Sequence, residues 1–80
     1  MSSFDEIFRG NVRLVLKKEE ALVLFEMLVD AKQKSAVPIR DIAERHEIRN
    51  LVCLFESALV EPFMPNYNDI IEEARRRVAS

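Results

Sequence analysis

The stretch E-A-L-V-L-F-E-M-L-V-D-A-K, residues 20–32, decides which fold this chain can adopt. Its length and its Leu, Ala, Met and Glu content favour a helix over a strand, and we predict a helix over residues 18–32. Nine of the eleven residues from 21 to 31 are apolar, and Glu26 and Asp30, four positions apart, share one narrow polar stripe. A helix at a protein surface has a broader polar face. We therefore expect this helix to be covered on nearly all sides.

The chain around this helix is short, with 80 residues of which 49% are hydrophobic and 32% are charged. This composition is typical of one globular unit, and we predict a single small helical domain over residues 1–80. Ordering so short a chain costs on the order of 120 kcal/mol of conformational entropy, and it buries only about 60–65% of its unfolded surface. We expect a second copy to cover the apolar surface that one chain cannot.

Residues 11–17, N-V-R-L-V-L-K, alternate as a β-strand does. The residues of one face are apolar: Val12, Leu14 and Leu16. The other face holds Asn11, Arg13, Val15 and Lys17. One strand cannot satisfy its own backbone groups, and the chain offers no second strand of similar quality. We therefore predict a mainly α fold with this one short N-terminal β-strand, paired with the same strand of a second copy in a homodimer.

The second half of the chain predicts two further helices. Residues 39–60 are helical in character, but the apolar stripe changes direction near residues 46–50, which predicts either a break there or two packing partners for one long helix. A loop with two prolines follows over residues 61–66, and we expect Phe63 to anchor it in the core. The last helix starts near Asn66 or Asn68 and carries one apolar stripe. The stripe consists of Ile70, Ile71, Ala74 and Val78.

The predicted dimer interface combines the apolar face of the strand with that of the helix over residues 18–32. It consists of Val12, Leu14, Leu16, Leu22, Phe25, Leu28 and Val29. Apolar surface beyond what a monomer can cover marks protein contacts. We therefore predict a non-enzymatic homodimeric protein-interaction module, conceivably regulatory or toxin-neutralising, with another protein as a second candidate partner.

The alternative is a DNA-binding dimer. The order strand, helix, loop, helix resembles ribbon-helix-helix proteins, repressors or antitoxins in which a two-stranded ribbon enters the major groove. The candidate nucleic-acid contacts are Asn11, Arg13 and Lys17. The formal net charge of −2, the absence of a glycine between the helices and the acidic Glu19 and Glu20 argue against this reading. Nucleic acid therefore ranks behind protein as a partner.

The chain has little from which to build an active site. Its only histidine, His46, and its only cysteine, Cys53, lie seven residues apart on a predicted helix, about 10 Å along the axis, too far to bind one metal ion. We expect Cys53 to be a small buried apolar residue. We predict no enzyme, no catalytic residue, no metal and no cofactor. Without a bilayer-spanning run or a signal-peptide layout, we predict a soluble cytoplasmic protein without a membrane partner.

Several motifs together resemble a family of small uncharacterised bacterial proteins. They are V-R-L-V-L (residues 12–16), E-A-L-V-L-F-E (20–26), E-P-F-M-P-N-Y (61–67) and the closing I-I-E-E-A-R (70–75). The family pattern E-P-F-x-P-x-Y is the most specific part, and the resemblance extends over most of residues 12–78. This chain departs from the pattern in a longer middle loop and in having no tryptophan in the middle helix. The resemblance implies a bacterial source and a domain formed by the whole chain, and no activity comes with it.

Overall fold

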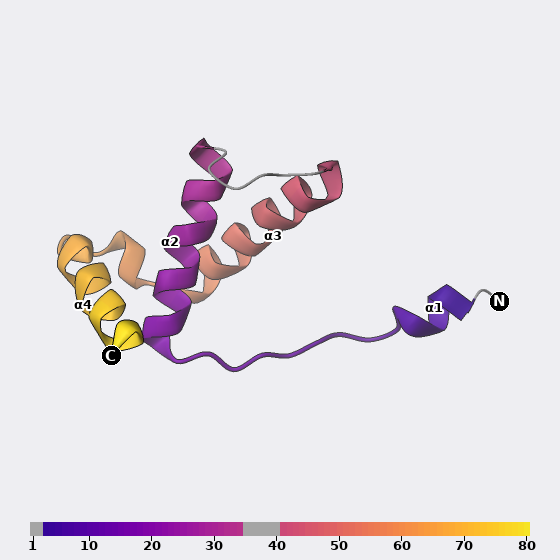
Figure 1. The fold of residues 1–80 in the computed structure, drawn as a ribbon, viewed down its shortest axis with the longest axis horizontal. Helices are drawn as coiled ribbons and strands as arrows, with labels where there is room; N and C mark the ends of the chain where they lie inside the picture. Colours follow the sequence, from indigo (N-terminus) through magenta and orange to yellow (C-terminus); the bar gives the residue numbers. More distant parts are fainter. Residues whose placement is uncertain (1–2, 35–40) are drawn as a thin grey trace.

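Three helices form the body of the protein, and a short helix lies apart from them at the end of an extended arm (Figure 1). The structure, a computed structural model, describes residues 3–34 and 41–80. The body consists of α2 (Lys18–Lys34), α3 (Ile42–Ala58) and α4 (Tyr67–Ala79), with the 3-10 helix η1 (Glu61–Phe63) before α4, and α1 (Ser3–Ile7) lies in the arm. The predicted mainly α fold is confirmed. Residues 3–34 and 41–80 of the single chain contain no β-strand, so the predicted N-terminal strand is not formed within one copy.

Helix α2 begins where its own sequence caps it. The backbone N–H of Lys17 donates to Glu20 Oε1 at 3.0 Å, and the carbonyl of Lys17 accepts from the N–H of Ala21 at 2.9 Å. A glutamate three positions after the cap satisfies a backbone donor that no helical carbonyl can reach. The predicted helix over residues 18–32 is thus confirmed, and it ends two residues later, at Lys34.

Helix α3 is continuous from Ile42 to Ala58, so of the two alternatives predicted for this segment, a break near residues 46–50 or one long helix, the structure has the unbroken helix. Asp41 caps its start by accepting hydrogen bonds from the N–H groups of Ala43 and Glu44. No proline or glycine interrupts the helix, and a change of apolar stripe alone does not break the backbone ladder. Of the first stripe, Ile42 is exposed, whereas Ile39 lies outside the described residues. The second stripe reaches the core through Val52 and Leu59, with Ile48 and Phe55 packed against the core, and Leu51 is half-buried.

The segment before α4 departs from expectation at one residue. Pro62 lies in η1, and Asn66 occupies the N-cap of α4 as predicted, although its side chain makes no capping hydrogen bond. Phe63 was the predicted anchor of this loop, but 72% of it is exposed. The 3-10 turn directs Phe63 away from the body, and Leu59 occupies the core instead.

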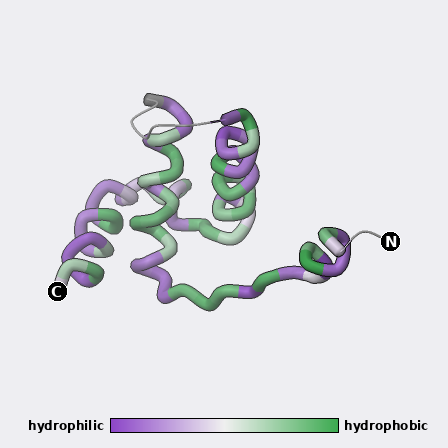
Figure 2. Tube along the Cα trace, turned by 45° about the vertical axis from the view of Figure 1, so that its right-hand side comes forward, coloured by the Kyte–Doolittle hydropathy of each residue, from purple (hydrophilic) through white to green (hydrophobic). Residues whose placement is uncertain are grey.

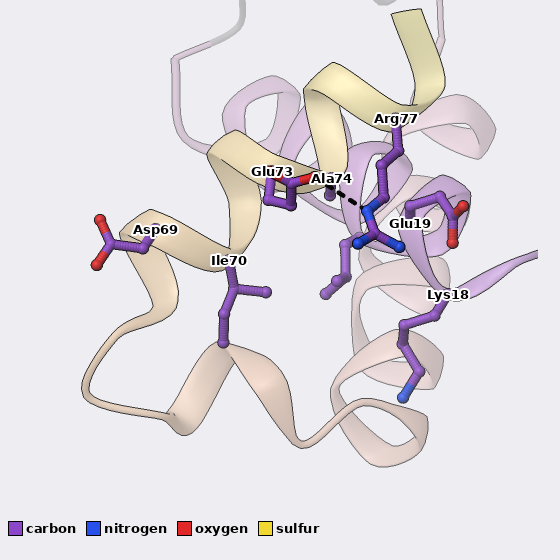
Figure 3. Close-up of a pocket in the computed structure, with 8 residues that line it drawn as sticks. Lys18, Glu19, Asp69, Ile70, Glu73, Ala74 and Arg77 are labelled. Atoms are coloured by element: carbon purple, nitrogen blue, oxygen red, sulfur yellow. Dashed lines mark hydrogen bonds and ion pairs between the residues drawn. The ribbon is translucent and has the colours of Figure 1, made fainter. Parts of the chain in front are cut away.

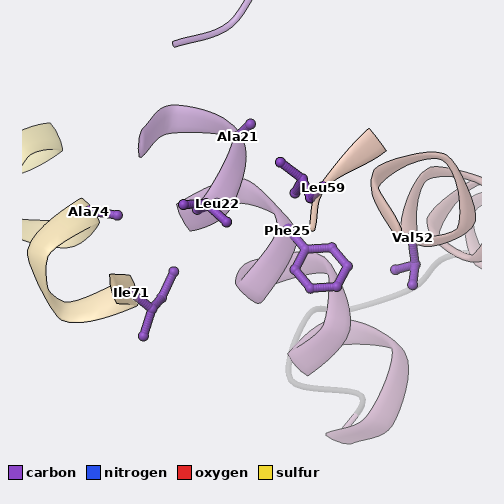
Figure 4. Close-up of a cluster of buried hydrophobic side chains, with 7 residues drawn as sticks. All are labelled: Ala21, Leu22, Phe25, Val52, Leu59, Ile71 and Ala74. Carbon is purple, nitrogen blue, oxygen red and sulfur yellow. The ribbon is translucent and has the colours of Figure 1, made fainter. Parts of the chain in front are cut away.

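The core lies along one side of α2, which packs against both α3 and α4 (Figure 4). The rings of Phe25 and Phe55 lie 6.3 Å apart and are tilted by 56°. The buried cluster consists of Ala21, Leu22, Phe25, Val52, Leu59, Ile71 and Ala74. Within the single chain α2 is not covered on nearly all sides, since Leu24 is 37% exposed and Met27 62%. Two neighbouring helices cover only part of the circumference of a third.

The arm before α2 makes the molecule elongated. Its longest dimension is 51 Å, and the radius of gyration is 15.4 Å, against about 12 Å for a compact chain of this length. Residues 11–17 run away from the body without a neighbouring strand (Figure 1). A strand is defined by the ladder to its neighbour, and the single chain provides none. None of the helices in residues 3–34 and 41–80 is both long and apolar enough to cross a membrane.

Candidate interaction surface

The N-terminal arm presents apolar side chains to solvent. Figure 2 shows the hydrophobic colour running along the extended segment and into α1. The exposed fractions range from 40% for Leu16 to 99% for Val15. The exposed set is Phe4, Ile7, Phe8, Val12, Leu14, Val15 and Leu16. Monomeric proteins seldom expose so many neighbouring apolar side chains.

The shape of the arm follows from one glycine. The N–H of Phe8 donates to the carbonyl of Phe4 at 3.0 Å and closes the last turn of α1. Gly10 then adopts φ +85°, a left-handed conformation in which a side chain would be strained, and helices commonly end in this way. From there the chain runs extended to Lys17, where α2 begins.

Charge separates the arm from the body. Residues 8–17 carry Arg9, Arg13 and Lys17 and no acidic residue, a formal charge of +3. Residues 18–80 carry nine basic and twelve acidic residues, a formal charge of −3, and Asp5 and Glu6 in α1 account for the remaining two acids. The charge of the arm is therefore complementary to the charge of the body, including the body of a second copy.

The structure divides the predicted interface residues between the arm and the core. Val12, Leu14 and Leu16 are exposed. Leu22 and Phe25 are buried within the chain, and Leu28 and Val29 pack against that core, so these four side chains stabilise the monomer. On α2 the side chains left for another molecule are Leu24 and Met27, which the sequence pattern does not separate from the rest of the apolar run. The candidate nucleic-acid contacts Asn11, Arg13 and Lys17 all lie exposed on the arm.

A pocket of about 380 Å³ lies between the first turn of α2 and the length of α4 (Figure 3). Its apolar lining comes from Leu22, Ile70 and Ala74. Its charged rim consists of Lys18, Glu19, Asp69, Glu73 and Arg77. An apolar floor inside a charged rim suits an apolar group that has a charge beside it. The sequence pattern does not reveal this pocket, because its walls lie about fifty residues apart.

Some of the rim charges are already paired. Lys18 Nζ lies 2.9 Å from Glu61 Oε2, and this hydrogen bond lowers the pKa of the Glu61 carboxyl group. The guanidinium group of Arg77 donates to Glu73 at 3.0 Å, which lowers the pKa of Glu73. Within the described part of the chain, Glu19 and Asp69 form no ion pair. These two carboxylates can therefore accept a basic group from outside.

A hydrogen bond between half-buried side chains holds the start of α4 against α2. Tyr67 Oη donates to Glu26 Oε2 at 2.9 Å. Burial of the phenol raises its pKa strongly, and the negative charge of Glu26 adds to the effect. Glu26 ends the motif E-A-L-V-L-F-E, and Tyr67 ends the motif E-P-F-x-P-x-Y. The two motifs are therefore the sequence signal that could have suggested a contact between these residues. Their observed contact stabilises the helix packing.

His46 and Cys53 lie exposed on α3. The expectation that Cys53 is buried is wrong, because the core face of α3 is the side that carries Val52 and Phe55, and Cys53 points away from it. Among the side chains that the structure describes, no group of three or more His, Cys, Asp or Glu residues is arranged to bind a metal ion.

The chain matches no protein-family model, no curated protein and no solved structure.

Proposed function

We propose that this chain is a non-enzymatic protein-interaction module that forms a homodimer through its N-terminal arm, with the cytoplasm as its expected location. The observation that carries the proposal is the arm itself, where Val12, Leu14 and Val15 are each at least 79% exposed on an extended backbone. Exposing this surface is unfavourable, and a second chain can cover it.

The arms of two copies pair with each other over residues 11–17. An extended segment without a neighbour leaves its backbone N–H and C=O groups open on both edges, and a second strand of the same sequence satisfies one edge. A two-fold axis makes the pairing antiparallel, since the same surface of both copies must meet. Val12, Leu14 and Leu16 of both arms then form one apolar face of a two-stranded ribbon. A further protein would bind the exposed Leu24 and Met27 of α2, in a regulatory or toxin-neutralising role.

The test is the oligomeric state, measured by size-exclusion chromatography with light scattering. The wild-type chain should be a dimer, and Leu14→Asp should be a monomer with unchanged helical content, because Leu14 lies outside the core. Met27→Asp is the control, since Met27 is also apolar and 62% exposed but lies on α2, and it should remain dimeric. A wild-type monomer at every concentration would overturn the proposal.

A second candidate function is DNA binding by the paired arms in the manner of ribbon-helix-helix proteins. The observation in its favour is that the extended segment directly precedes α2 and carries Arg13 and Lys17 without an acidic residue. In this case, the affinity for double-stranded DNA should fall steeply with salt, and Arg13→Ala should reduce the slope of log K against log [salt] by about 1. Failure to bind DNA at low salt would rule this function out and leave the homodimer standing.

A further inference from the structure

We propose that Phe8 of one copy inserts into the pocket between α2 and α4 of the second copy, and that Arg9 beside it pairs with Glu19 on the rim. This inference rests on the proposed homodimer and names the surface that receives the end of each arm. The occupant is a second copy of this chain.

The register of the paired arms brings the two parts together. The segment 11–17 forms the most backbone pairs when its central residue, Leu14, lies on the two-fold axis. Residue 11 of one copy then lies opposite Lys17 of the other, immediately before Lys18 and Glu19, which line the pocket. Phe8 is three residues from Asn11, a reach of at most about 10 Å, so it lies close to the first turn of the partner's α2, which forms one wall of the pocket.

The chemistry of the two surfaces also agrees. Phe8 is 78% exposed in the single chain, and an aromatic side chain buries about 150–250 Å² when it is covered. The pocket offers Leu22, Ile70 and Ala74 as an apolar floor and about 380 Å³ of space. Figure 3 shows Asp69 and Glu19 on opposite sides of this space. Neither carboxylate has an ion-pair partner among the described residues, and the arm supplies a guanidinium group next to Phe8.

The interface area favours reciprocal exchange. A stable interface buries about 800 Å² on each partner. The ribbon alone uses only residues 11–17, which leaves Phe4, Ile7 and Phe8 exposed at its ends. When both copies exchange arms, each copy donates one arm and accepts the other. Both pockets are then filled, and the interface contains two arm–pocket contacts in place of one.

The inference is tested by crosslinking single-cysteine chains in a Cys53→Ser background. Copies with Phe8→Cys are mixed with copies with Ile70→Cys, at a protein concentration high enough to offset the weaker dimer expected without the Phe8 ring, and treated with a short thiol-to-thiol crosslinker. Every link between positions 8 and 70 then joins two chains, and mass spectrometry identifies it. Ser57→Cys on α3 replaces Ile70→Cys as the matched control, since Ser57 lies outside the pocket. We expect efficient 8–70 links and no 8–57 links.

A second measurement does not depend on crosslinking. Phe8→Ala should weaken the dimer by at least about 30-fold, the loss typical of an aromatic anchor in an interface. Phe63→Ala is the control, because Phe63 is 72% exposed on the body, and it should leave the dimer unchanged.

The outcomes separate this inference from the proposed function. A dimer that shows no 8–70 link and is unaffected by Phe8→Ala overturns the inference and leaves the arm-paired dimer. A wild-type monomer overturns both. A doubly substituted Phe8→Cys, Ile70→Cys chain that links within a monomer would place Phe8 in its own pocket and also overturn the inference.

Discussion

Tyr67 Oη donates a hydrogen bond to Glu26 Oε2 at 2.9 Å and ties the start of α4 to the middle of α2 across 41 positions of sequence. A second tie, between Lys18 and Glu61, joins the first turn of α2 to η1. Together they fix the E-P-F-M-P-N-Y segment against α2 at two points. The polar residues of this motif therefore have a structural role, which is to orient α4 and thereby shape the pocket.

Tyr67→Phe should lower the free energy of unfolding by about 1–2 kcal/mol. The phenylalanine ring keeps the packing of Tyr67, but the half-buried carboxylate of Glu26 loses its donor. Urea denaturation followed by circular dichroism measures the difference. Glu26→Gln is the gentler comparison, since its amide oxygen can still accept from Tyr67, and it should cost less. Equal stability of Tyr67→Phe and wild type would mean that water donates to the Glu26 carboxylate as favourably as Tyr67 does.

The same contact makes stability fall at high pH. Burial and the Glu26 charge raise the pKa of Tyr67 in the folded protein above its ordinary value of 10.0. Above that pH the phenol ionises in the unfolded chain but stays protonated in the folded one, so the unfolded state binds fewer protons and becomes favoured. Tyr67 is the only tyrosine and the chain has no tryptophan, so ultraviolet absorbance of tyrosinate follows this one group directly.

We expect tyrosinate to appear together with loss of helical circular dichroism. Tyr67→Phe should remove this part of the pH dependence, while the titration of the lysines stays in both proteins. A phenol that titrates at its ordinary pKa in the fully helical protein would contradict the buried hydrogen bond.

A smaller loss of stability is expected at low pH. Lys18 lowers the pKa of Glu61 below 4.5, chiefly through their hydrogen bond. The resulting stabilisation is present above about pH 4.5 and disappears as the pH falls through the lowered pKa, because the folded state resists protonation. Since Lys18 is largely exposed, the pair contributes only about 0.2–1 kcal/mol. Lys18→Met should abolish this part of the pH dependence of the free energy of unfolding, measured by urea denaturation. If the loss of stability at low pH is the same in Lys18→Met as in the wild type, the pair contributes nothing.

Two leucines of α2 should respond very differently to truncation. Leu22 is 2% exposed and Leu24 is 37% exposed, although they lie two residues apart in the same apolar run. Leu22→Ala leaves a cavity in the core and should cost about 2–5 kcal/mol. Leu24→Ala should cost less than about 1 kcal/mol, because its side chain is only partly covered. Similar losses at both positions, measured by urea unfolding, would mean that α2 is covered on the side that the structure leaves open.

Local patterns predicted the helices because the information for them is local. The run of helix-forming residues, the glutamate that caps α2 and the asparagine before α4 all lie within a few positions of the structure they specify. The same pattern overestimated the burial of α2, since an apolar side chain such as Met27 looks identical in sequence whether or not a neighbour covers it. The apolar stripe of α3 pointed to the core residues Val52 and Leu59, but its change of direction left open whether the helix is broken.

By itself the sequence determined a mainly helical chain, the position of its three main helices and an arm whose alternating residues suit an extended backbone, since these depend on propensity, capping and periodicity over short distances. The tertiary structure decided which sides of α2 are covered, that Phe63 lies outside and Leu59 inside, and that Leu22, Ile70 and Ala74 converge to line a pocket. These features depend on how α3 and α4 pack around α2, and the contacts that set this packing join residues some thirty or more positions apart.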